Sequence, residues 1–282
     1  MKPFVSVLVA TDFSPEANLA ARRAASIGRE AGLRGALIHV LPNSLPADIH
    51  IQAAVQAQQA LALVSEELTR EGLPVESQLL SGDIAGELTR AASGFDFIVT
   101  GARGEALLLE FALGRTSVRL VRESRRPVLI VKRPPQTPYR RVIAAVDFSE
   151  PSYEAAACGA QIAPQADFDL VHAFEVEFES TLRLAGAVED KIHAYRREAR
   201  EKAMLAMERF SRRLPLPRER IWPTVVHGYP PKVILDRARE TQAELIVIGK
   251  HAAGVIEHAL IGSVALQVLE MAQCDVLIVP GS

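Results

Sequence analysis

Residues 9–14 read Val-Ala-Thr-Asp-Phe-Ser, and almost the same sequence recurs at residues 145–149 as Ala-Val-Asp-Phe-Ser. Further stretches match in the same order: 37–40 with 170–173, 97–101 with 245–249, 113–114 with 261–262, and 127–131 with 275–279. Because the order is kept while the spacing drifts slightly, we interpret the chain as a duplicated domain with loops of different length. Each unit, about 140 residues long, is large enough to fold by itself.

Apolar, β-branched segments alternate with helical patterns in both halves. Segments that are apolar on both faces are typical of buried parallel strands, and strict alternation favours an α/β fold. Strands are expected at 4–10, 35–41, 75–80, 95–100 and 127–132, then at 141–147, 168–174, 222–227, 244–248 and 275–279. Helices are expected at 15–32, 47–72, 83–93 and 114–125, then at 150–163, 185–213, 230–241 and 262–273.

This pattern predicts two tandem doubly wound domains, each a five-stranded parallel sheet in the order 3-2-1-4-5 with helices on both faces. Domain 1 is expected over residues 1–133 and domain 2 over residues 140–282. The linker, residues 134–139, contains three prolines, which favour a short and stiff connector. We therefore expect the halves to pack closely.

Composition narrows the function classes. A net charge of −2 gives no basic face for nucleic acid. The two cysteines provide no disulfide framework and suit a reducing compartment. No segment approaches the roughly 18 apolar residues of a membrane span, and the N-terminus lacks a signal-peptide pattern. The expected location is the cytoplasm.

Three features of the first half point to a ligand site where the strand order reverses. Asp12 ends the first strand, where it could accept hydrogen bonds from a ribose or simply cap the next helix. Gly101 and Gly104 follow the fourth strand, either to admit an anion or as an ordinary turn. Residues 114–117, Gly-Arg-Thr-Ser, begin the last helix, whose amides could bind an anion.

The spacing of Gly101, Gly104 and Gly114, with Asp12 at the first strand end, resembles the universal stress protein family in its ATP-binding branch. Each half of the chain shows this resemblance, so that together the two halves account for essentially the whole sequence. The resemblance therefore implies a tandem universal stress protein. It implies that Ala10, Thr11, Asp12 and Val40 surround adenine and ribose, and that the phosphates are held by Gly101, Arg103, Gly104, Gly114, Thr116 and Ser117. It also implies that the last strand of each half pairs with the other. Two chains are further expected to form a homodimer.

Both halves depart from the family pattern. Arg115 replaces the small hydroxyl residue after the third glycine, where it would either neutralise a phosphate or obstruct the pocket. In the second half, Ala252 replaces the second glycine. The second site is therefore expected to be partly degenerate; its residues are Asp147, Gly249, Gly262, Ser263 and Val264.

The leading hypothesis is a stress-response protein that binds ATP, with or without Mg²⁺, as a conformational or assembly signal. No general base can be named, so any hydrolysis is expected to be slow. Four histidines of the second half (His172, His227, His251 and His258) lack metal-ligand spacing and are expected to hydrogen-bond locally. The alternative is a non-nucleotide scaffold that engages a protein or lipid-like partner through residues 185–213. That segment is otherwise expected to cover the sheet as a solvated amphipathic helix, with an apolar stripe formed by Ile192, Tyr195, Ala199, Ala203, Ala206 and Phe210.

Overall fold

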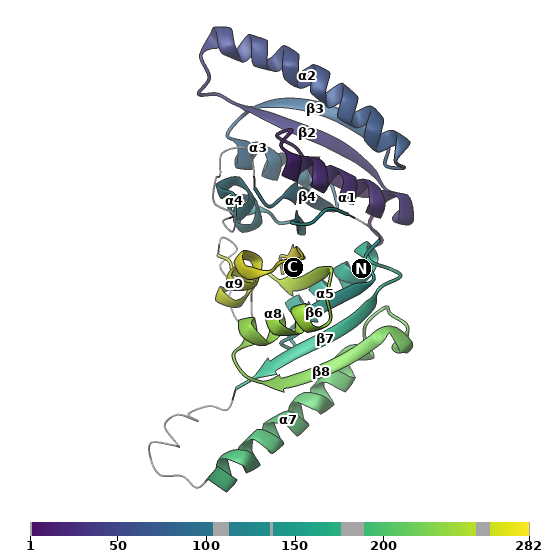
Figure 1. Ribbon diagram of the computed structural model, residues 1–282, viewed down its shortest axis with the longest axis vertical. Coiled ribbons are helices and arrows are strands. Elements are labelled where there is room, and N and C mark those ends of the chain that lie inside the picture. Colours follow the sequence, from purple (N-terminus) through teal and green to yellow (C-terminus); the bar gives the residue numbers. More distant parts are fainter. Residues whose placement is uncertain (1, 104–112, 136–137, 176–188, 252–259, 282) are drawn as a thin grey trace.

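The computed structural model describes residues 2–103, 113–135, 138–175, 189–251 and 260–281 (Figure 1). The first half contains β1 (Ser6–Ala10), α1 (Pro15–Ala31), β2 (Arg34–Pro42), α2 (Ala47–Arg70), β3 (Val75–Gly82), α3 (Ile84–Ala91), η1 (Ala92–Gly94), β4 (Phe97–Gly101), α4 (Arg115–Glu123) and β5 (Val128–Val131). The second half contains β6 (Arg141–Ala145), α5 (Glu150–Ile162), β7 (Asp167–Phe174), α7 (Glu189–Ser211), η2 (Arg218–Arg220), β8 (Ile221–His227), α8 (Pro230–Glu240), β9 (Leu245–Gly249), α9 (Ser263–Met271) and β10 (Asp275–Val279). The predicted α/β alternation is confirmed.

All ten strands form one sheet, in the order β3-β2-β1-β4-β5-β10-β9-β6-β7-β8. Each half has the predicted order 3-2-1-4-5 and is parallel throughout. The halves join where β5 and β10 pair antiparallel, with Leu129 opposite Leu277. The sheet therefore runs the length of the elongated molecule, from β3 at one end to β8 at the other (Figure 1).

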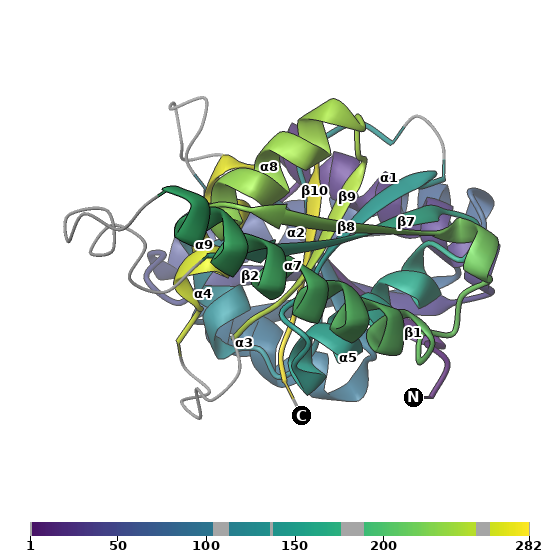
Figure 2. The same cartoon turned by 90° about the horizontal axis from the view of Figure 1, so that it is seen from below.

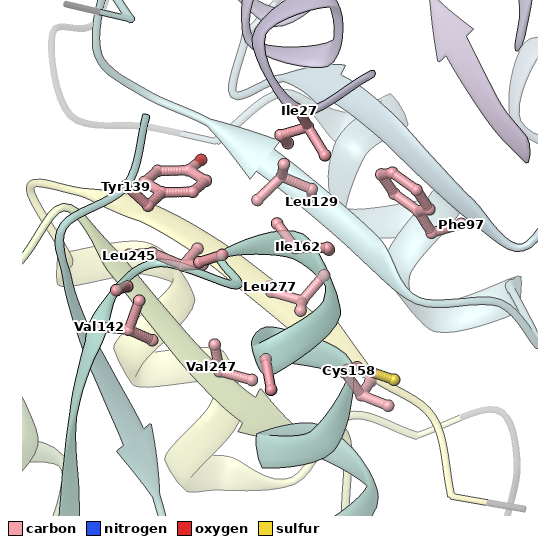
Figure 3. Close-up of a cluster of buried hydrophobic side chains, with 14 of the residues drawn as sticks. Ile27, Phe97, Leu129, Tyr139, Val142, Cys158, Ile162, Leu245, Val247 and Leu277 are labelled. Atoms are coloured by element: carbon pink, nitrogen blue, oxygen red, sulfur yellow. The ribbon is translucent and has the colours of Figure 1, made fainter. Parts of the chain in front are cut away.

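Helices cover both faces of the sheet, and each face has its own core. One core packs α1, α2, α5 and α7 against the sheet, and the other packs α3, α4, α8 and α9. Successive strand residues alternate between the cores, as Val7 and Leu8 do. Figure 3 shows the first core crossing the junction of the halves, where Ile27 and Leu129 lie near Tyr139 and Leu277.

Local sequence explains how the first helix of each half is placed. Ser14 caps α1 by accepting a hydrogen bond from the Ala17 amide at 3.2 Å, and Ser149 caps α5 in the same way. A proline follows each serine within the first helical turn, where its missing amide costs nothing. Both helices thus begin directly beyond the duplicated Asp-Phe-Ser turn, which fixes that turn beside the end of the first strand.

A buried polar cluster joins the two halves. Asp275, which is fully buried at the start of β10, accepts hydrogen bonds from Tyr139 Oη at 2.6 Å and from the Lys132 amide at 2.8 Å. It also pairs with Arg23 of α1, whose Nε lies 3.2 Å from Asp275 Oδ2. The Arg23 guanidinium stacks over the Tyr139 ring at 4.1 Å. Burial, followed by the nearby Asp275 charge, raises the pKa of Tyr139, so the phenol keeps the proton that it donates.

Two lysines reach across the same junction to helix ends. Lys132, just after β5, donates from Nζ to the carbonyls of Leu269 and Ala272 at 2.6 and 2.7 Å, at the C-terminal end of α9. Lys250, just after β9, donates from Nζ to the Arg122 carbonyl at the C-terminal end of α4. A cation at a helix C-terminus interacts favourably with the helix dipole. Each half thus anchors the last helix of the other.

The segment expected to cover the sheet end as an amphipathic helix does so as α7, beside β7 and β8 (Figure 2). Ile192, Ala203 and Phe210 of its predicted apolar stripe are buried, and Met207 joins them. Tyr195, which was assigned to that stripe, is instead 50% exposed, because the buried line runs along a neighbouring row of the helix. Residues 185–188 of the predicted helix lie outside the described residues. Within the described part of the chain, no helix is both long and apolar enough to cross a bilayer.

Candidate functional site

A cavity of about 260 Å³ lies at the carboxyl ends of β6 and β9, where the strand order of the second half reverses. This is the position at which open α/β sheets bind ligands. Its walls come from strand ends, from the first turn of α5, from α8 and from the start of α9. The lining residues are Ala145, Val146, Asp147, Ser152, Val171, Ala173, Pro230, Ile234, Ile248, Gly249, Lys250, His251, Gly262, Ser263, Val264 and Ala265.

All five residues predicted for the second site line this cavity: Asp147, Gly249, Gly262, Ser263 and Val264. The apolar wall that sequence reasoning missed could have been found from the repeat. Ala145, Val146 and Ala173 occupy the positions of Ala10, Thr11 and Val40 in the first half. Transferring those first-half residues along the repeat identifies three further lining residues. Ile234 of α8 and Ile248 of β9 complete the apolar wall.

The duplicated Asp-Phe-Ser turn has the same geometry in both halves. Asp12 Oδ1 accepts hydrogen bonds from the Ser14 amide at 3.1 Å and from Ser14 Oγ at 2.5 Å. Asp147 accepts the corresponding pair from Ser149, with the amide at 3.0 Å. Both aspartates therefore orient the serine that caps the next helix. Both are also exposed at the strand tip, so the capping role leaves the carboxylate facing solvent.

A histidine and a phenylalanine brace each of these turns. Phe13 and Phe148 both have a left-handed backbone with φ of 64°, and their rings pack against His39 and His172 at 4.6 and 4.2 Å. His172 Nδ1 lies 2.8 Å from the Val146 carbonyl, and His39 makes the same contact with Thr11. Burial lowers the pKa of His172, which favours the neutral ring. These residues hold the strand end in place, a role that the repeated Asp-Phe-Ser motif signalled only indirectly.

The third glycine of each motif is the N-cap of a helix that has no side-chain cap. Gly114 precedes α4 and Gly262 precedes α9, and neither N-cap residue caps its helix through a side-chain hydrogen bond. The Gly114 and Gly262 amides are bound by the carbonyls of Ala102 and Lys250, at 2.9 and 2.8 Å. The next amides of α4 and α9 are the unsatisfied donors that bind anions at helix N-termini.

In the first half, Ala10, Thr11, Val40 and Gly101 are buried around the ends of β1, β2 and β4. Arg103 is half-buried just beyond β4, whereas Gly104 and the rest of residues 104–112 lie outside the described residues. Arg115 is exposed at the start of α4. Together with Thr116, it lines a neighbouring hollow of about 570 Å³ against Gly82 and Asp83.

Ser117 and Gly101 have structural roles in the first half. Ser117 is buried, and its Oγ donates to the Gly101 carbonyl at 2.9 Å, so the start of α4 is tied to β4. A Cβ on Gly101 would lie 2.9 Å from the backbone of Glu16 in α1. In the second half, the nearest atoms to a Cβ on Gly249 are 3.4 Å away. The fourth strand of the first half therefore requires glycine for packing.

Among the residues that the structure describes, His172, His227 and His251 do not come together as a metal site. His172 braces the first strand end, His227 ends β8 at the outer edge of the sheet, and His251 follows β9. His258 lies outside the described residues. Within those residues, no three His, Cys, Asp or Glu side chains are placed to hold a metal ion. Lys250 is buried, which lowers its pKa, and its Nζ is directed to α4 rather than to the cavity.

Comparisons with known proteins identify the family to which this fold belongs. A model described as the universal stress protein family matches residues 4–132 and again residues 138–280. A universal stress protein of Mycolicibacterium smegmatis is 27% identical over 97% of this chain and 96% of its own length. Universal stress protein YxiE of Bacillus subtilis is 25% identical over 50% of this chain and 99% of its own. The crystal structure of a universal stress protein from Archaeoglobus fulgidus covers 98% of each chain at 20% identity, with a TM-score of 0.73, which shows the shared fold. This chain therefore belongs to the universal stress protein family and carries two of its domains in tandem.

Proposed function

We propose that this protein binds an adenine nucleotide, ATP, at the strand-end clefts of its two domains, and that the bound nucleotide acts as a conformational or assembly signal. The observation that carries the proposal is the 260 Å³ cavity at the reversal point of the second half. Small-molecule sites have volumes of about 300–1,000 Å³, and this cavity lies just below that range. We therefore propose that it encloses the nucleoside, while the phosphates extend beyond it.

The chemistry of the cavity wall matches the parts of a nucleotide. Val171, Ile234 and Ile248 offer an apolar surface to a base. The exposed carboxylate of Asp147 can accept hydrogen bonds from ribose hydroxyls. The amides at the start of α9 can receive a phosphate, helped by the helix dipole.

The two sites are expected to differ in phosphate affinity. The first half keeps Thr11 and Thr116, where the second has Val146 and Val264. It also adds Arg103 and Arg115 near the start of α4, whereas the Lys250 ammonium in the second half is bound to the Arg122 carbonyl. We therefore expect the first half to hold a triphosphate, with or without Mg²⁺, more tightly than the second.

The contacts between the halves give the nucleotide a route to a conformational effect. A ligand at the start of α4 or α9 binds a helix whose far end is anchored by a lysine of the other half. A ligand stabilises whichever domain arrangement binds it best. Nothing in this signal requires hydrolysis, so slow or absent turnover is expected.

The test compares aspartate with asparagine at the N-cap glycines. Gly114 and Gly262 have φ of −63° and −59°, which either residue adopts, and both are good N-caps. Only aspartate adds a negative charge beside the expected phosphate. By calorimetry, Gly114→Asp is expected to bind ATP at least about tenfold more weakly than Gly114→Asn, because the change opposes a charge-assisted contact. The pair at Gly262 reports on the second site. Equal ATP affinities for the two variants at both positions, or no ATP binding by the unmodified protein, would contradict the proposal.

A further inference from the structure

A second hollow, of about 700 Å³, lies between α7 and the ends of β7 and β8, at the outer end of the sheet. Its apolar residues are Phe174, Val225 and Val226. Phe174 and Val225 pack on the core beneath α7, which is the face of the sheet opposite to α8 and α9. The hollow is therefore separate from the proposed nucleotide site. We call it the α7 groove.

Among the residues that the structure describes, the polar side chains that line the α7 groove are arginines and histidines, with no carboxylate. His193, Arg196, Arg197 and Arg200 line it from α7, and His227 lines it from β8. The four residues of α7 stand at positions i, i+3, i+4 and i+7, so they form one stripe along the helix. Glu198 of the same helix is not in the groove; it pairs with Lys202 at 2.6 Å. The arginines of this stripe thus concentrate positive charge on one wall.

The arginines and the apolar floor together define the chemistry of a ligand. Within the described part of the chain, neither Arg197 nor Arg200 forms an ion pair with a carboxylate, and both are exposed. Guanidinium groups bind phosphate oxygens through paired hydrogen bonds. Phe174 and Val225 offer an aromatic and an aliphatic surface beside these groups, and the Phe174 ring already packs edge-on against His227 at 5.4 Å.

We propose that the α7 groove is a binding site for a small organic phosphate, whose phosphate is held by Arg197 and Arg200 and whose apolar part packs on Phe174 and Val225. The groove lies within the range of small-molecule sites, about 300–1,000 Å³. A phosphate monoester carries nearly two negative charges, which the arginine stripe balances. This site is independent of nucleotide binding at the strand ends.

The test titrates phenyl phosphate into the full chain carrying Gly114→Asp and Gly262→Asp, so that the strand-end sites do not contribute. Binding is measured by calorimetry and by the ring signals of His193 and His227 in NMR spectra. Phenyl phosphate is expected to shift both histidines and to bind more tightly than phenol or inorganic phosphate. The result does not depend on whether ATP binds elsewhere.

Paired variants on α7 separate the groove from the general charge of the helix. Arg197→Gln with Arg200→Gln is expected to weaken phenyl phosphate binding by about tenfold, because two charge-assisted contacts are lost. Arg209→Gln with Arg212→Gln removes the same charge in the last turn of α7 and just beyond its end, outside the groove, and is expected to change binding by less than about twofold. Equal weakening by both pairs, unshifted histidine signals, or equal affinity for phenol or inorganic phosphate would overturn the proposal.

Discussion

Replacing Asp275 with asparagine is expected to lower the free energy of unfolding by about 3 kcal/mol. The carboxylate is the centre of the polar cluster between the halves, where it pairs with Arg23 at 3.2 Å and accepts from Tyr139 Oη at 2.6 Å. The side chains of Arg23 and Asp275 are only 5% and 1% exposed. The Asp275→Asn change therefore leaves a buried guanidinium without its counter-charge.

The magnitude follows from what is lost and what remains. Removing one partner of a buried ion pair costs about 3–5 kcal/mol, because the other charge stays desolvated. The asparagine oxygen can still accept from the Lys132 and Arg133 amides, which Asp275 binds at 2.8 and 3.2 Å. Arg23 also keeps its stacking over the Tyr139 ring. These retained contacts place the expected loss at the lower end of that range.

The assay is equilibrium unfolding in urea, followed by circular dichroism, on four proteins: the unmodified chain, Asp275→Asn, Arg23→Met and the double variant. Because the double variant removes both buried charges, it should be more stable than the sum of the single effects predicts. The coupling is expected to be about 2 kcal/mol, within the range for residues in direct contact. A loss below about 1 kcal/mol for Asp275→Asn, or additive single effects, would refute the reasoning.

Three further predictions concern four positions. Gly101→Ala should cost about 1–3 kcal/mol, because its Cβ would lie 2.9 Å from the Glu16 backbone. Gly249→Ala should leave the free energy of unfolding nearly unchanged. Similar losses of this free energy for Gly101→Ala and Gly249→Ala, measured by urea unfolding, would contradict this account. Gln242→Gly should raise the free energy of unfolding by about 0.5–1 kcal/mol, because Gln242 follows α8 with φ of 52°, and a drop in melting temperature would count against it. Native His172 resists protonation because burial holds its pKa below the unfolded value of 6.5. Its stabilisation is present above pH 6.5 and is lost as pH falls from there toward the folded pKa. As the pH falls below 6.5, the unmodified protein should therefore lose more stability than His172→Asn. If the two proteins give parallel curves of stability against pH, this role of His172 is excluded.

The duplicated motifs were sufficient to predict the fold, because each half repeats the same alternation of strands and helices. The pairing of β5 with β10 was expected from the family resemblance and is confirmed; the structure adds that the two strands run antiparallel, with Leu129 opposite Leu277. The burial of Tyr139 could not be predicted from the composition of the linker. Tyr139 lies in a proline-rich stretch, yet it is only 3% exposed, because its ring and hydroxyl complete the Arg23–Asp275 pair.

For the candidate site, the sequence indicated which residues lie together but not which contacts each side chain makes. The five residues assigned to the second site do line one cavity, because strand ends at the reversal point meet at one edge of the sheet. The hydrogen bond from Lys250 Nζ to the Arg122 carbonyl could not be predicted, because Arg122 lies at the end of α4, distant from Lys250 in the sequence. The α7 groove was also missed. The charges of α7 were visible in the sequence, but their meeting with Phe174 and His227 depends on how the helix lies on the sheet.

The central claim, that the strand-end clefts hold an adenine nucleotide, is tested most directly on freshly purified protein. The protein is denatured, and the released small molecules are identified and counted by chromatography. We predict ATP or ADP in proportion to the chain, reduced in Gly114→Asp and retained in Gly114→Asn. If no nucleotide is released, and millimolar Mg-ATP leaves the melting temperature unchanged, the claim is contradicted.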